Sequence, residues 1–282
     1  DHVAVGREFG PYVYVFNADT LIQLATFLSP SPSYSTSFGE SLATHGSRLL
    51  VGAFEEPGSV PGGGGAAYVF DLQTYSLVTE LIPSGPMNTL REFGIAVEVH
   101  GDRAAVSATE AGASQRTGVV RLYTLEPSPT QVLRIEGEDE EDEFGTYLAL
   151  NDDYLCISGD NRIAVYDVNT LALLGDVDLA PYPSNLARIT LVEDRIYAGL
   201  GHKVWVFDAD TQQQIGQLIP TYQPGQNGGF GRDVAASGDA LSDATIAVTR
   251  SLRGSSFLYD ADSYAGIERF VATASAPGPQ SI

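Results

Sequence analysis

The feature that most constrains the fold of this chain is a hairpin signal that recurs along its whole length. In five copies an aromatic residue is followed by Asp or Asn, and Thr or Ser comes three positions after that; a sixth copy, at Tyr123, is divergent. An Asp or Asn side chain in such a turn accepts backbone N–H bonds from the residues that follow. The intervals between the aromatic residues are 54, 53, 43, 41 and 52, which is the spacing of propeller blades. The aromatic residues are Phe16, Phe70, Tyr123, Tyr166, Phe207 and Tyr259.

A second signal, Phe-Gly, opens four of the repeats, at Phe38, Phe93, Phe144 and Phe230. In the clearest repeat, residues 38–82, four short apolar runs separated by turn residues follow it. That pattern is typical of an antiparallel four-stranded meander. We expect the glycine to permit close approach of the backbone in an innermost strand, and the phenylalanine to pack between neighbouring blades.

Together these signals predict an all-β fold, a six-bladed β-propeller of four-stranded antiparallel blades that forms a single domain over residues 1–282. A closed all-β fold of this size is common as one domain. The expected repeats are approximately 1–29, 38–82, 93–136, 144–179, 186–220 and 230–273.

The start of the chain matches the turn that precedes the second strand in later repeats, because Asp1-His2 stands where Asp152-Asp153 and Asp194-Arg195 stand. The first blade is therefore expected to lack its innermost strand at the N-terminus. Two sources of that strand stay open. One is the C-terminal tail, in which Pro277 and Pro279 disfavour a strand. The other is a strand from outside this chain segment, in which case the chain is a fragment of a longer protein.

The succession of Phe38-Gly39, the run LVGA at 50–53 and the run AYVF at 67–70 resembles the FG-GAP repeat family, found in integrin α-subunit heads and in bacterial secreted propellers. The resemblance covers most of the chain. It implies a β-propeller that serves adhesion or recognition and often binds calcium. The family's calcium motif, Asp-x-Asp-x-Asp-Gly, is absent from the corresponding loops at 44–47 and 99–102. We therefore expect no cofactor, with Ca²⁺ as the one ion to test.

The net charge of −21, with Lys203 as the only lysine, indicates the kind of partner. Such a surface repels nucleic acid and anionic lipid and attracts basic partners. No apolar stretch approaches the ~18 residues of a membrane span, so direct membrane insertion is not expected. Acidity suits a salty medium, and together with the family resemblance it predicts an extracellular or cell-surface location. Cys156 stands alone in an apolar run and is expected to be buried.

An acidic run at 136–143 precedes Phe144-Gly145 and is expected in a loop between blades. Clustered carboxylates can bind Ca²⁺, although a continuous run more often forms a solvated acidic face. The second group of acidic residues surrounds a turn in the last repeat. The candidate metal ligands are Glu138, Asp142, Glu143, Asp239 and Asp243.

Two long connections, 53–67 and 108–118, are expected to emerge on the same face as the loops between blades and to form a groove with the acidic run. The glycines at 62–65 lead into a strand and lack the Lys and Ser/Thr of a phosphate-binding loop. His45 and His100 occupy equivalent turns, which favours a role in turn geometry. The expected binding residues are Glu55, Glu56, Glu110, Arg116, Glu138, Asp139 and Glu140.

Three functions follow from these observations. The first is a recognition or adhesion module that binds a protein or glycan partner through loops on one face. The alternative is a glycan-active enzyme, a lyase or hydrolase with its site at the mouth of the central channel, because propellers also host enzymes. Its catalytic carboxylates would be Glu55, Glu110 and Glu143, since a glycosidase needs two such groups about 5–10 Å apart. The third is a structural part of a larger assembly.

Overall fold

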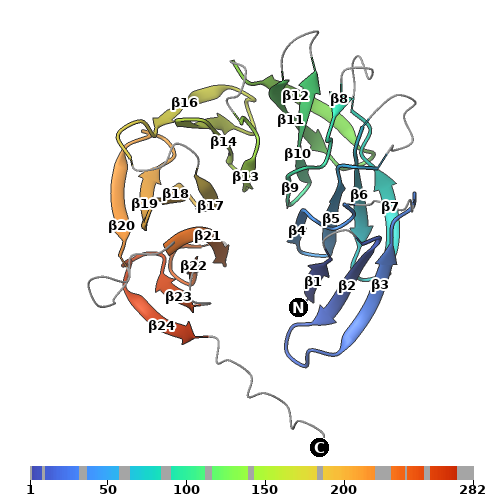
Figure 1. Ribbon diagram of the computed structural model, residues 1–282, viewed down its shortest axis with the longest axis horizontal. Coiled ribbons are helices and arrows are strands. Elements are labelled where there is room, and N and C mark those ends of the chain that lie inside the picture. The colour runs from blue at the N-terminus through green and yellow to red at the C-terminus, as the bar shows by residue number, and fades with distance from the viewer. Residues whose placement is uncertain are drawn as a thin grey trace, which may run out of the picture. The chain divides into compact units, whose positions relative to one another are not determined.

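The structure is a computed structural model, and its described part contains only strands and their connections (Figure 1). This part contains no helix that is long and apolar enough to cross a membrane. The described residues are 2–7, 10–31, 37–56, 64–83, 90–111, 116–138, 143–182, 187–219, 230–238, 240–250 and 255–271.

The chain divides into two compact units, Asp1–Leu179 and Ala180–Ile282. The first unit holds four sheets and the second holds two. Each sheet follows the chain from strand to neighbouring strand, with antiparallel pairing throughout. We refer to the sheets as the first to sixth blades in chain order.

The first blade has three strands in the order β1-β2-β3. They are β1 (His2–Gly6), β2 (Tyr12–Asn17) and β3 (Gln23–Leu28). Strand β1 pairs with β2 as the second strand pairs with the third in later blades, so the expected lack of an innermost strand is confirmed for the described residues. The tail at 272–282, one of its two expected sources, lies outside those residues.

The other three blades of the first unit each contain a four-stranded meander, and the third also has a short extra strand, β8, that pairs with β10. The second blade consists of β4 (Leu42–His45), β5 (Arg48–Ala53), β6 (Ala66–Asp71) and β7 (Ser76–Glu80). The third consists of β8 (Leu90–Arg91), β9 (Val97–His100), β10 (Arg103–Ala111), β11 (Arg116–Thr124) and β12 (Thr130–Glu136). The fourth consists of β13 (Tyr147–Leu150), β14 (Tyr154–Gly159), β15 (Arg162–Asp167) and β16 (Leu173–Asp178).

The second unit contains two four-stranded blades. The fifth consists of β17 (Arg188–Val192), β18 (Arg195–Leu200), β19 (Lys203–Asp208) and β20 (Gln214–Leu218). The sixth consists of β21 (Phe230–Ser237), β22 (Thr245–Arg250), β23 (Ser255–Asp260) and β24 (Gly266–Val271). With six such sheets, the fold is the predicted all-β, six-bladed propeller.

Apolar side chains of adjacent blades form the cores. In the first unit, Phe38 and Tyr68 of the second blade pack with Val13 and Phe27 of the first. In the second unit, Phe230 packs with Tyr197 in a core made by the fifth and sixth blades. Phenylalanine therefore fills the space between blades, as expected from the Phe-Gly signal, and its burial removes a large apolar area from water.

The repeated hairpin joins the third and fourth strands of the blades. In the first blade, Asn17 Oδ1 accepts bonds from the Thr20 N–H (2.8 Å) and the Thr20 hydroxyl (2.8 Å). Asp71, Asp167, Asp208 and Asp260 bind the Thr or Ser three residues on in the same way. The expected role of these residues in turns is confirmed.

The expected close approach of the backbone at the Phe-Gly glycine is confirmed, but its place varies: Gly231 lies within the innermost strand β21, whereas Gly94 precedes β9. Gly94 lies in the turn before β9 with φ +93°, and a Cβ there would stand 2.2 Å from the Ala66 carbonyl oxygen of the second blade. A Cβ on Gly52 would in turn stand 2.0 Å from the Gly94 carbonyl oxygen. The glycines are thus needed where backbones of neighbouring blades meet and where the chain takes a left-handed conformation.

Candidate functional site

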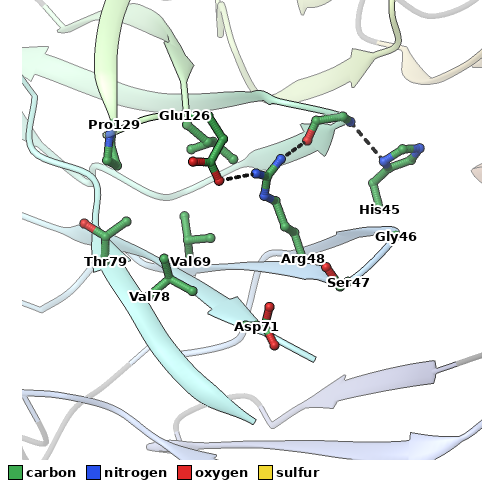
Figure 2. Close-up of a pocket in the computed structure, with 12 residues that line it drawn as sticks. His45, Gly46, Ser47, Arg48, Val69, Asp71, Val78, Thr79, Glu126 and Pro129 are labelled. Atoms are coloured by element: carbon green, nitrogen blue, oxygen red, sulfur yellow. Dashed lines mark hydrogen bonds and ion pairs between the residues drawn. The ribbon is translucent and has the colours of Figure 1, made fainter. Parts of the chain in front are cut away.

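A pocket of about 420 Å³ lies between the second and third blades, at the end of the sheets where the first strand turns into the second and the third into the fourth (Figure 2). All its lining residues belong to the first unit. They are His45, Gly46, Ser47, Arg48, Val69, Asp71, Val78, Thr79, Gly101, Leu125, Glu126 and Pro129.

Arg48, the first residue of β5, links the two blades across this pocket. Its Nη2 donates to Glu126 Oε1 at 2.7 Å, and its Nη1 donates to the Gly101 carbonyl oxygen (Figure 2). Asp102 Oδ1 lies 3.8 Å from the same Nη1. The guanidinium is thus held by acceptors from the third blade, in the planar arrangement that arginine favours.

Two histidines form one wall of the junction. The rings of His45 and His100 stack with centroids 3.9 Å apart, and the Gly101 backbone N–H donates to His45 Nδ1 at 2.9 Å. His45 therefore accepts at Nδ1, and His100 Nε2 lies 3.4 Å from Asp152 Oδ1 of the fourth blade. The equivalent positions of His45 and His100 in their repeats predicted a role in the turns. The contact between the two rings also links the second and third blades.

Asp71 supplies a fixed negative charge to the pocket. Its Oδ1 accepts bonds from the Thr74 N–H, the Thr74 hydroxyl and the Gln73 N–H. The bond from the Thr74 backbone N–H is the main cause that lowers the pKa of Asp71 below its usual value. The described residues offer no hydrogen bond to Oδ2, which leaves that oxygen available as an acceptor.

The remaining lining is largely apolar. Val69 and Leu125 are buried, and Val78 of β7 is 60% exposed, while Pro129 is also exposed. The pocket therefore combines aliphatic surface with two carboxylates, Asp71 and Glu126. Such a mixture of apolar lining and a few placed polar groups is typical of binding sites.

The predicted binding and catalytic residues at 55–56 lie at the other end of the second blade, because β5 begins at Arg48 and ends at Ala53. Glu55 is exposed, and its backbone N–H donates to Ser37 Oγ at 2.8 Å. Glu56 is fully buried. It accepts bonds from the hydroxyls of Ser29 and Tyr68, so it joins the first two blades from within. Burial raises its pKa, and the bonds from Ser29 and Tyr68 oppose that rise.

The other predicted residues are spread over the third and fourth blades. Glu110 and Arg116 lie in β10 and β11, and their side chains lie outside the description. Glu138 is exposed, with its Oε1 3.2 Å from Arg162 Nη1. Glu143 is exposed, and its carbonyl accepts a bond from the Thr146 hydroxyl. Asp139, Glu140, Asp142 and Asp239 lie outside the described residues.

Within the part of the chain that the structure describes, no three His, Cys, Asp or Glu side chains come close enough to hold a metal ion. Asp243, the described member of the second candidate group, is exposed in the turn before β22. Cys156 is buried in β14, and burial raises the pKa of its thiol.

Sequence reasoning missed the pocket because it treated its residues as turn formers. The sequence predicts Asp71 in a hairpin, which it does form, and His45 in a turn. Arg48 carries a usable signal, since an arginine also begins the second strand of the third and fifth blades, at Arg103 and Arg195, in a chain with few basic residues. Only the packing of the two blades shows that Arg48 and Glu126, 78 positions apart, touch.

Comparison with protein-family models gives no match, and no curated protein matches the chain either. Among solved structures, the chain resembles the crystal structure of the Myceliophteria thermophila Cps50 (Swd1) beta-propeller domain, with a TM-score of 0.60 and 14% sequence identity. The match covers 97% of this chain and 84% of that one. It shows a shared fold. At this identity the likeness carries no statement about ligand or partner.

Proposed function

We propose that this protein is a recognition module that binds a polypeptide partner at the pocket between the second and third blades. The observation that carries the proposal is the combination in one pocket of aliphatic walls, from Val78 and Pro129, with the carboxylates of Asp71 and Glu126. A pocket of this size can accept a side chain of a partner while neighbouring exposed turns contact its backbone.

The same proposal includes kinship with the FG-GAP repeat proteins and a place outside the cell or at its surface. The Phe-Gly pairs and the glycine contacts between blades support the kinship, since both recur from blade to blade. The net charge of −21 supports an exterior location, because screening by salt reduces self-repulsion. A glycan in place of a polypeptide is the second ligand class to test.

Selection from a displayed library of random polypeptides, with the full chain immobilised, tests the proposal. Val78→Arg places a long side chain across the pocket mouth and should weaken the selected binders at least tenfold. Glu55→Ala, at the opposite end of the same blade, is the matched control and should leave their affinity unchanged. The proposal fails if no saturable polypeptide binding is found, or if Glu55→Ala rather than Val78→Arg removes it.

The glycan-active enzyme stays the alternative, and one observation directs its test. Asp71 and Glu126, a pair that sequence reasoning did not select, bring two carboxylates into one pocket. Incubation with glycans and chromatography of the products decides between the two functions. Turnover that is lost in both Asp71→Asn and Glu126→Gln would favour the enzyme, because glycosidases use two carboxyl groups.

A further inference from the structure

We propose that the pocket accepts a basic side chain, lysine or arginine, presented by the polypeptide partner. This inference rests on the proposed function and names the chemistry that the pocket recognises. It is carried by three observations: the balance of charge in the lining, the oxygens left open there, and the shape of the apolar walls.

The lining carries two carboxylates, Asp71 and Glu126, against one guanidinium, that of Arg48. Asp102 stands next to Arg48 as a third carboxylate. The Arg48 guanidinium donates to Gly101 and Glu126 and its charge also acts on Asp71, so it offsets one of the three carboxylates and leaves the group negative. An added cation therefore meets a negative potential, which the overall charge of −21 strengthens.

The acceptors that a cation needs are available in the pocket. Asp71 uses Oδ1 for its turn and Glu126 uses Oε1 for Arg48, and the described residues give no donor to Asp71 Oδ2 or Glu126 Oε2. The hydrogen bonds from Thr74 lower the pKa of Asp71 and so keep its carboxyl group ionised at neutral pH. A charged donor and a charged acceptor form stronger hydrogen bonds than neutral groups do.

The walls suit the stem of such a side chain. Lysine and arginine carry three or four methylene groups below the charged end, and these groups pack on apolar surfaces. Val78 and Pro129 supply that surface on the exposed side, and Val69 and Leu125 supply it on the buried side. Figure 2 shows Val78, Val69 and Pro129 around the space that faces Glu126. The stem would lie against these residues, with the cationic end near Asp71 and Glu126.

Chemical-shift titration of the isotope-labelled full chain tests the proposal with three probes: capped lysine, capped norleucine and capped glutamate. We expect capped lysine to shift the backbone amides of Gly46, Ser47, Val78 and Thr79 saturably, with a dissociation constant in the millimolar range. Norleucine keeps the stem and lacks the charge, so it should bind at least tenfold more weakly. Equal binding of norleucine overturns the proposal, and preferred binding of glutamate would assign recognition to Arg48.

The variant Asp71→Asn combined with Glu126→Gln should remove the lysine response. Both changes keep the acceptors used by the turn and by Arg48, and Asn17 shows that asparagine supports the same turn in the first blade. Asp167→Asn is the matched control, because it neutralises the equivalent turn of the fourth blade outside the pocket. An equal loss in the control would show general electrostatic attraction and overturn the site. Polypeptide binders that are blocked by Val78→Arg yet contain no essential basic residue would refute this inference and leave the proposed function standing.

Discussion

At the scale of single residues, the same hairpin turn is built with two different side chains, which makes its contribution measurable. Asn17 occupies the position that Asp holds in the second, fourth, fifth and sixth blades. The amide oxygen and the carboxylate oxygen accept the same bonds from the Thr or Ser three residues later. The fold therefore requires an acceptor here, and the charge is free to serve another purpose, as in Asp71.

Asn17→Ala should lower the free energy of unfolding by about 1 kcal/mol, because it removes the acceptor for the backbone N–H and the hydroxyl of Thr20. Asn17→Asp should stay within ~0.5 kcal/mol of the parent protein. Urea unfolding followed by circular dichroism measures both. An equal loss in the two variants would mean that the turn does not depend on this acceptor.

Glu98 of β9 should make stability fall as pH rises. Burial raises its pKa to about 8, so the folded protein holds a proton that the unfolded chain, with a pKa near 4.5, releases. Between about pH 4.5 and 8 the folded state binds more protons, and the free energy of unfolding therefore decreases with pH. Because Glu98 is half-buried, we expect a loss of only about 1–2 kcal/mol across this window.

Glu98→Gln removes this titration and tests the assignment. The variant should match the parent protein near pH 4.5 and be more stable than it at pH 8.5. Thermal melts at a series of pH values provide the comparison. The assignment is wrong if the two proteins keep a constant difference in melting temperature over that range.

At the scale of elements, the contacts between blades depend on backbone approaching backbone. Gly94 has φ +93°, and its neighbour across the junction is the Ala66 carbonyl oxygen. Gly94→Ala should destabilise the protein by about 2–3 kcal/mol, since a methyl group meets a backbone atom and the left-handed conformation disfavours it.

Gly266→Ala is the control for this change. A Cβ on Gly266 would make only an ordinary contact, at 3.7 Å from the Tyr259 ring. Its effect should stay below ~0.5 kcal/mol. Denaturant midpoints that move equally in the two variants would show that the glycine contacts between blades do not stabilise the fold.

Strand β1 is more exposed than the second strands of other blades, and we propose that its open edge pairs with a further strand. Val3 and Val5 are 43% and 46% exposed, whereas β5 and β14 are almost entirely buried beneath an innermost strand. A sheet edge offers unpaired N–H and C=O groups that can bind another strand. The occupant would resemble β4 or β13, four-residue strands in which leucine and alanine occur beside polar or aromatic residues.

Hydrogen exchange tests this pairing. In the isolated chain, amides of β1 that point away from β2 should exchange faster than those of β5. Addition of a peptide with the sequence of residues 37–45, which contains a complete innermost strand, should slow them. A peptide that leaves β1 exchange unchanged, even at millimolar concentration, argues against strand addition at this edge.

At the scale of the whole molecule, the excess of 36 acidic over 15 basic side chains governs the response to ions. We expect millimolar Ca²⁺ to raise the melting temperature little more than NaCl does at equal ionic strength, because screening needs no saturable site. A specific site would add about 2.7 kcal/mol at one hundred times its dissociation constant. Calorimetric titration distinguishes them: micromolar, saturable binding lost on neutralising the acidic run 138–143, or on Asp239→Asn with Asp243→Asn, would contradict this expectation.

The architecture was predictable from the sequence because its determinants are local. An Asx turn lies within five residues, and a strand shows itself in a few alternating apolar positions, so repetition of these signals identified the blades and the incomplete first one. The glycines of the Phe-Gly pairs and their close backbone contacts were predictable as well, whereas their left-handed conformation was seen only in the structure. These are properties of short segments, which the order of residues specifies directly.

Which residues line the pocket depends on how the second and third blades pack in the tertiary structure. Arg48 and Glu126 are far apart in the chain, and the recurrence of an arginine at the start of the second strand does not indicate which acceptor it reaches in the next blade. Likewise Glu56 stands in an acidic, glycine-rich segment, yet the packing of the first two blades buries it against Ser29 and Tyr68. Burial and pairing arise from which blades become neighbours and how closely their backbones approach, and these follow from the sum of many weak contacts rather than from any one stretch of residues.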